Sequence, residues 1–472
     1  METLIKLAIA TPLALGIYYI LPRRGQNIWL LLISYLFYST WSWQFALILA
    51  GLTLANYAVA RRIVRVTVPD RRWLIAGITL NVAALVLFKY ADFFLAELTR
   101  FNLGTSLVAL KIILPIGLSF LILQTISYLV DVYQGILEPR ESLLDFALYL
   151  AYFPKLISGP IERARTFLPQ LATDRQITHE TRTRGLALIL MGALRKIIIA
   201  DTLYALIPKT AFENPAAFPA PILWSSLLAF AFALYNDFAG YSNIARGISD
   251  LFGIQLSSNF EFPYFAQSFG EFWSSWHITF SNWLRDYIYF PVARFLRGKV
   301  RDPRHPLNVV IPPMLTMLVS GMWHAITIPM LLWGALHGIY QVGERILLFR
   351  APRKPGQHSQ QPLWRQILSA LTVFVLVILA WVPFHTTLPA TLQFWQGLFS
   401  LTQWALPDVR IFVVLILALL LDALLFVQHE EAAVLRWPSM ARIALIVFVC
   451  VSVYLILEGG VGITRPFVYQ GF

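Results

Sequence analysis

The sequence has 472 residues, of which 58% are hydrophobic and only 13% are charged, and its formal net charge is +12. A soluble domain carries about 25% charged residues, so this composition excludes a soluble protein and predicts a membrane protein. The arginines fall mainly in short loops between apolar runs, which indicates membrane orientation and anionic lipid and argues against nucleic-acid binding. Cys450 is the only cysteine, so intrachain disulfides and cysteine-built metal sites are excluded.

Long apolar runs recur along the whole chain and predict an all-α polytopic membrane protein. We expect about 11–12 transmembrane helices, with re-entrant or short helices around a central funnel. The expected spans are residues 4–21, 28–42, 44–60, 73–90, 107–130, 185–206 and 223–238, a hairpin over 308–349, and residues 366–384, 410–427 and 441–457. The first is expected to be a retained span and not a signal peptide.

Short basic loops predict the orientation of these spans, because loops rich in Lys and Arg stay in the cytoplasm. Residues 22–25 and 61–72 are such loops, so the N-terminus is expected outside the cytoplasm. Residues 143–158 are short, and Pro154 and Lys155 interrupt them, which predicts a re-entrant segment that lines a cavity.

A single domain over residues 1–472 is expected. Its parts are N-terminal helices over 1–135, a catalytic core with re-entrant segments over 136–350, a cytoplasmic linker over 351–365, and C-terminal helices with a tail over 366–472.

Two histidines, His277 and His324, stand where hydrocarbon is expected, each directly after a tryptophan. An ionisable side chain is costly to bury in a membrane, so both are candidates for a functional site. The alternative is that each is a hydrogen-bonded packing residue.

Residues 272–291 predict an aromatic helix with a polar row. If this stretch is helical, His277, Ser281 and Arg285 share one face at i, i+4 and i+8. A histidine, a hydroxyl and a guanidinium together would suit an anionic or strongly polar ligand. The alternative for Arg285 is an ion pair with Asp286.

His324 is suited to act as a general base, because the unperturbed pKa of an imidazole lies close to working pH. His337 lies thirteen positions further on, and on one ideal helix the two rings would point about 220° apart. We therefore expect no shared metal, and no other metal-binding pattern occurs in the sequence. Because Gly-x-Ser-x-Gly is also absent, direct transfer to an incoming hydroxyl is expected.

A series of short motifs resembles the membrane-bound O-acyltransferase family, in its bacterial branch of alginate O-acetyltransferases and relatives that acetylate cellulose and peptidoglycan or D-alanylate teichoic acids. The motifs, in order, are YLFY at 35–38, FKYADFF at 88–94, LPIGLSF at 114–120, SYLVDVY at 127–133, FPKLISGPI at 153–161, YNDFAGYSNIA at 235–245, WH at 276–277 with WLRDY at 283–287, MWH at 322–324, WGALHG at 333–338 and PFVYQGF at 466–472.

The resemblance implies that His324 is the catalytic histidine and His277 the second polar residue facing it. We expect the funnel and substrate site to be lined by Trp276, Ser281, Arg285, Asp237, Tyr241 and Trp323. The sequence departs from the family at Ser274 and Ser275, where two basic residues are usual, and at Ala325, where glycine is usual.

The resemblance further implies a bacterial inner-membrane enzyme with acetyl-CoA as acyl donor and no bound cofactor or metal. Its expected partners are the lipid bilayer and an esterase-like (SGNH) periplasmic acetyltransferase, and not nucleic acid. Two interpretations of Tyr469 stand: a relay that accepts the acyl group, or an interfacial aromatic anchor. A D-alanyl or other acyl donor, a transporter or flippase, and a structural scaffold are alternatives, and the acceptor polymer stays open.

Overall fold

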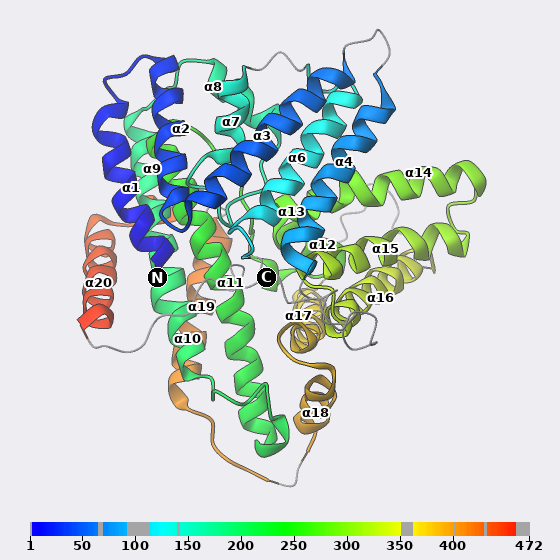
Figure 1. Ribbon diagram of the computed structural model, residues 1–472. Helices are drawn as coiled ribbons and strands as arrows, with labels where there is room; N and C mark the ends of the chain where they lie inside the picture. Colours follow the sequence, from blue (N-terminus) through cyan, green and yellow to red (C-terminus); the bar gives the residue numbers. More distant parts are fainter. Residues whose placement is uncertain are drawn as a thin grey trace, which may run out of the picture. The chain divides into compact units, whose positions relative to one another are not determined.

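The computed structural model describes residues 2–64, 69–91, 113–138, 142–350, 362–400, 403–428 and 432–458 (Figure 1). All regular secondary structure in these residues is helical, which confirms the expected all-α fold class. Tyr469, most of the linker 351–365 and part of the expected span 107–130 lie outside the described residues.

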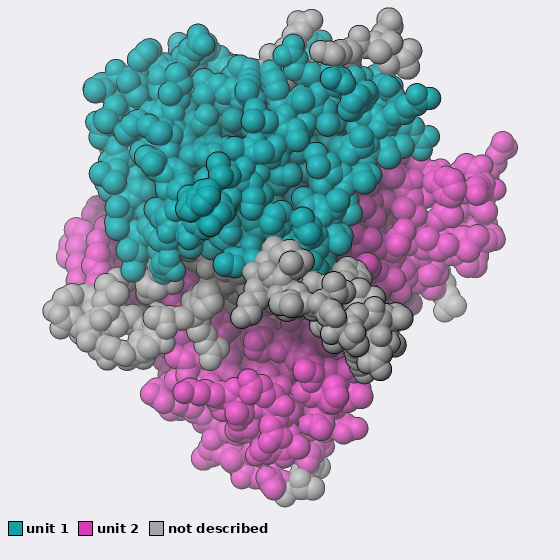
Figure 2. Space-filling model, viewed as in Figure 1, with its two compact units in different colours: residues 1–186, 245–257 teal, residues 187–244, 258–472 magenta. Residues whose placement is uncertain are grey.

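The chain forms two compact units, coloured separately in Figure 2. The first comprises residues 1–186 and 245–257, and the second comprises residues 187–244 and 258–472. This division follows neither of the boundaries expected after residues 135 and 350, and the single domain stays a prediction.

The first unit contains the N-terminal helices. They are α1 (Glu2–Tyr18), α2 (Arg23–Ser39), α3 (Trp43–Ile63), α4 (Arg71–Leu85) with the π-helix η1 (Val86–Tyr90), α6 (Leu118–Tyr133), α7 (Leu143–Ala151), α8 (Ala164–Ala172) and the first half of α9 (His179–Ala193). The end of α11 (Ala220–Leu251) also belongs to this unit.

The second unit contains the remaining helices. They are the π-helix η2 (Leu194–Ala200), α10 (Asp201–Leu206), η3 (Pro215–Ala217), most of α11, η4 (Pro263–Phe265), α12 (Phe269–Ser275), α13 (Ile278–Leu284), the π-helix η5 (Arg285–Tyr289), α14 (Phe290–Lys299), α15 (Pro306–His324), α16 (Ile328–Arg350), α17 (Leu363–His385), α18 (Leu388–Leu398), α19 (Val409–Gln428), η6 (Ala433–Arg436) and α20 (Ser439–Glu458).

Among the described residues, six helices are long and apolar enough to cross a membrane: α3, α4 with η1, α11, α15, α17 and α19. The protein is thus a multi-pass membrane protein, while the total of 11–12 spans stays a prediction. Helix α11 continues to Leu251, so the end expected at residue 238 is wrong. Its later polar residues stay helical because they find partners inside the protein, as Asp250 does with Arg184 at 2.7 Å.

The segment expected to be re-entrant consists of a short helix and a buried irregular stretch. Helix α7 has nine residues and spans about 14 Å, less than half of a hydrocarbon core of about 30 Å. Ser142 begins it by accepting a hydrogen bond from the backbone N–H of Asp145. The stretch from Tyr152 to Arg163 is buried throughout, and Nζ of Lys155 donates to Oε1 of Gln124.

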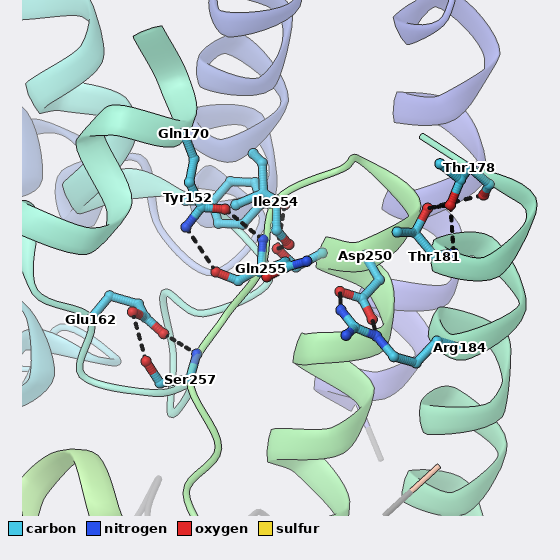
Figure 3. A network of polar contacts seen from close by, with 11 residues as sticks. Tyr152, Glu162, Gln170, Thr178, Thr181, Arg184, Asp250, Ile254, Gln255 and Ser257 are labelled. Atoms are coloured by element: carbon cyan, nitrogen blue, oxygen red, sulfur yellow. Dashed lines mark hydrogen bonds and ion pairs between the residues drawn. The ribbon is translucent and has the colours of Figure 1, made fainter. Parts of the chain in front are cut away.

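A polar network holds this stretch within the first unit (Figure 3). The carboxylate of Glu162 accepts hydrogen bonds from the backbone N–H and the hydroxyl of Ser257. Gln170 and Gln255 exchange two further hydrogen bonds, of 2.8 and 3.1 Å. Buried irregular backbone needs such partners, because unpaired polar groups are costly away from water.

Candidate active site

A cavity of about 370 Å³ lies within the second unit. It is lined by Gly270, Trp273, Ser274, Ser281, Asn282, Leu284, Arg285, Tyr289, Pro313, Thr316, Met317, Gln341 and Arg345. Two of these residues, Arg285 and Arg345, are always charged and present several donors each. The cavity therefore suits an anionic ligand such as a phosphate group.

Three rows of residues, each with members four positions apart, extend from the cavity. The first lies along α13 and consists of Arg285 and Ser281, with His277 at the start of the helix. The expected continuous helix over 272–291 is wrong, because the chain breaks between α12 and α13 and His277 adopts a left-handed conformation with φ of 42°. The helix restarts at His277, whose carbonyl accepts from the N–H of Ser281 at 2.9 Å. The spacing is therefore helical from Ile278 onward, so Ser281 and Arg285 share a face and both line the cavity, whereas His277 caps the helix and does not line the cavity.

The turn at His277 is fixed by hydrogen bonds to a neighbouring loop. The backbone carbonyl of Asn259 accepts from Ile278 N–H at 2.8 Å, and its side-chain oxygen accepts from the Thr279 hydroxyl at 2.6 Å. Asn259 in turn donates to Ser242 of α11 at 2.9 Å. Short polar contacts thus hold a strained residue in place.

The second polar row lies on α15, where Thr316, Ser320 and His324 are four residues apart and share one face. Thr316 lines the cavity, and His324 is the last residue of the helix. The eight residue steps from Thr316 to His324 span about 12 Å. Ala325 is extended, with φ of −160°, so the helix ends directly after His324.

The third row lies on α16 and consists of Trp333, His337, Gln341 and Arg345, again four residues apart. Gln341 and Arg345 line the cavity. Helices α15 and α16 form a close antiparallel hairpin (Figure 1). A Cβ on Gly334 would lie 2.4 Å from the carbonyl oxygen of Met317, so only glycine allows this approach.

The three rows meet at an aromatic cluster around His324, which is 3% exposed. The ring of Phe280 contacts both histidines, with centroids 5.1 Å from His277 and 6.0 Å from His324. Trp333 contacts His324 at 5.4 Å and His337 at 4.9 Å. The expectation that His324 and His337 point apart assumed one straight helix, and it is wrong because the chain turns back between them.

The arrangement brings a buried imidazole to the inner end of a polar row that begins at Thr316 in the cavity. The cavity also holds Arg345 and Arg285, and Arg285 forms the ion pair with Asp286 that was the alternative expected for it, at 3.1 Å. A ligand with an anionic end and a reactive end about 12 Å away could reach the cavity and the imidazole at once. Within the described part of the chain, no group of three or more His, Cys, Asp and Glu could hold a metal ion.

The other residues expected in the funnel are placed differently. Trp323 contacts Phe280 at 4.5 Å and belongs to the aromatic cluster. Trp276 is 2% exposed and packs against Trp381. Asp237 does not line the cavity and forms a buried ion pair with Lys196 at 2.6 Å.

Tyr241 is fully buried, one turn further along α11 than Asp237. It does not line the cavity either. Tyr469 lies outside the described residues.

Two groups of polar residues were not predicted as functional from the sequence. Gln341 and Arg345 lie on the cavity, and their four-residue spacing from His337 was the signal that could have revealed them. Arg195 and Lys196 lie buried on the π-helix η2, and a basic pair inside an apolar span is itself a functional signal. Arg195 pairs with Asp422 of α19 at 2.5 Å.

The fold and the site define a multi-pass helical membrane protein in which one helix carries both a residue that lines a cavity with two arginines and, at its end, a buried histidine. Comparison with known proteins agrees with this class. The profile of the membrane-bound O-acyltransferase family matches residues 138–384. The chain belongs to this family, and it is an O-acyltransferase.

Among its relatives is a probable alginate O-acetylase of Pseudomonas putida, which is 35% identical over 84% of this chain and 80% of the relative. The corresponding protein of Pseudomonas aeruginosa is 36% identical over 84% of this chain and 74% of its own length. A peptidoglycan O-acetyltransferase of Helicobacter pylori is 33% identical over 81% of this chain and 76% of its own length.

Proposed function

We propose that the protein transfers an acetyl group from a cytoplasmic thioester, acetyl-CoA, to a hydroxyl for O-acetylation of a polysaccharide outside the cytoplasm. The observation that carries the proposal is the position of His324, at the inner end of a row that begins in a cavity with two arginines. The names of the relatives support acetyl transfer to a cell-envelope or secreted polymer.

In this reaction His324 is the general base. Its ring nitrogen removes the proton of the acceptor hydroxyl while the oxygen attacks the thioester carbonyl. The carbon–sulfur bond then breaks, and the departing thiolate receives the proton from His324. His277 stabilises the oxyanion or orients the base, and positioned donors of this kind contribute roughly 10²–10³ in rate.

The cavity holds the anionic end of the donor. Arg285 and Arg345 bind its phosphate groups, because a guanidinium matches a phosphate with paired hydrogen bonds. The thioester arm then runs about 12 Å along α15 toward His324. Trp323, Phe280 and Trp333 enclose the reacting carbonyl and exclude water.

The decisive experiment is donor turnover by the purified full-length protein, measured as release of thiol and transfer of labelled acetyl. His324→Ala should abolish both. The matched control is His179→Ala, which removes an exposed histidine at the start of α9 and should leave turnover unchanged. Turnover by folded His324→Ala at the wild-type rate would refute the mechanism, and labelled D-alanyl donor consumed in preference to acetyl-CoA would refute the acetyl donor.

The proposal places the protein in the bacterial inner membrane with its N-terminus outside and with an esterase-like periplasmic transferase as partner. The orientation is tested in spheroplasts with a membrane-impermeant maleimide. Because Cys450 is the only cysteine, Cys450→Ser gives an unlabelled background, and Glu2→Cys should then be labelled without lysis. Labelling only after lysis would show that the N-terminus lies in the cytoplasm.

A further inference from the structure

Two buried polar side chains, Ser320 and His337, lie between the cavity and His324. On α15, Ser320 is halfway between Thr316 of the cavity and His324. On α16, His337 lies between Gln341 of the cavity and Trp333, which contacts His324. Both residues thus lie on the helix faces that connect the cavity lining with His324.

The hydroxyl of Ser320 is fully buried and has no hydrogen-bond partner among the described residues. Thr316, one turn earlier, behaves as hydroxyls in helices usually do and donates to the carbonyl of Pro312 at 2.6 Å. Leaving a buried hydroxyl without a partner is costly, so that of Ser320 is expected to serve a ligand.

The imidazole of His337 is also a fully buried polar group, and neither of its ring nitrogens has a hydrogen-bond partner among the described residues. Aromatic rings surround it, with Trp273 at 5.1 Å and Trp333 at 4.9 Å between centroids. Trp273 also lines the cavity, so His337 lies directly behind the cavity wall.

We propose that Ser320 and His337 bind the amide groups in the pantetheine arm of the proposed acetyl-CoA donor. The inference rests on the proposed function and deepens it. An amide offers one N–H and one carbonyl, and both a hydroxyl and a neutral imidazole can donate and accept. Trp273 and Trp333 supply apolar walls for the methylene groups between the amides.

The test compares two acetyl donors that share the reacting thioester. Acetyl-pantetheine carries two amides, and S-butyl thioacetate carries none. With Ser320→Ala and with His337→Phe, kcat/KM for acetyl-pantetheine should fall about tenfold, the effect of one lost hydrogen bond at the upper end of the usual range. The value for S-butyl thioacetate should stay within twofold of wild type.

Ser225→Ala is the matched control, because Ser225 is a buried serine whose hydroxyl already donates to the carbonyl of Ile222. Ser225→Ala should leave kcat/KM unchanged for both donors. His337→Gln restores a donor and an acceptor, so it should recover part of the loss seen with His337→Phe. If His337→Phe does not fold, Ser320→Ala and His337→Gln provide the test. His337→Gln should then keep the wild-type preference for acetyl-pantetheine over S-butyl thioacetate.

Equal losses with both donors would mean that Ser320 and His337 only support the fold, and unchanged values with both would also overturn the inference. Either result leaves the proposed function standing. That function fails by a separate measurement, which is turnover of S-butyl thioacetate by His324→Ala at the wild-type rate.

Discussion

The indole of Trp333 packs at a right angle to the imidazole of His324, with an interplanar angle of 88° and ring centroids 5.4 Å apart. The two residues come from opposite arms of the hairpin of α15 and α16. Trp333 is 1% exposed, and Phe384 of α17 contacts both rings. The orientation of His324, the proposed catalytic base, thus depends on packing between helices, because His324 is the last residue of its own helix.

Trp333→Phe should reduce kcat modestly, and Trp333→Leu should reduce it by roughly 10²-fold, because small misplacement of a reacting group has effects of that size. Phe keeps a flat ring beside His324, whereas Leu does not. The measurement is thiol release at saturating donor. KM for the donor should rise by a smaller factor than kcat falls, because Trp333 is also one apolar wall of the proposed site for the donor arm. A loss confined to KM would show that Trp333 does not position the base.

Arg285→Gln and Arg345→Gln should each raise KM for acetyl-CoA by about three- to tenfold. This effect is smaller than for a fully buried charged hydrogen bond, because water reaches the cavity and screens the charges. The same variants should leave KM for acetyl-pantetheine nearly unchanged, since that donor lacks the phosphates. The control is Arg410→Gln, which removes an exposed arginine that pairs with Asp408. Equal effects on both donors would contradict phosphate binding at these arginines.

The sequence predicts the fold class well, because apolar runs and basic loops reflect the membrane directly. It also predicts that Ser281 and Arg285 share a helix face, and both line the cavity. Their spacing is kept because the left-handed turn at His277 comes before them, but His277 itself caps the helix and does not line the cavity.

The relation of His324 to His337 was argued from one ideal helix, although the apolar pattern also predicts a hairpin over 308–349 that contains both residues. The sequence shows a spacing of thirteen residues but not the extended conformation of Ala325, which reverses the chain. The ion pair of Asp237 could not be predicted either. Its partner, Lys196, lies on another helix, and a single sequence does not show which distant residues meet.

Tyr469→Phe separates the two interpretations of the C-terminal tail. A phenylalanine keeps the aromatic anchor but removes the hydroxyl that a relay needs. If Tyr469 is a relay, the variant should lose polymer acetylation by at least about 10²-fold, and labelled acetyl should disappear from the last peptide. Retention of polymer acetylation, with no label on the wild-type tail during turnover, would favour the anchor.

Lys196 should contribute strongly to stability, because it lies between two buried carboxylates, 2.7 Å from Asp201 and 2.6 Å from Asp237. Lys196→Met leaves both acids without their cation. Removing one partner from a buried ion pair typically costs about 3–5 kcal/mol, so the variant should unfold at clearly lower temperature in detergent. Adding Asp237→Asn to Lys196→Met should recover part of this loss, because one uncompensated charge is removed. A double variant less stable than Lys196→Met alone would show that Asp237 is stabilised by groups other than Lys196.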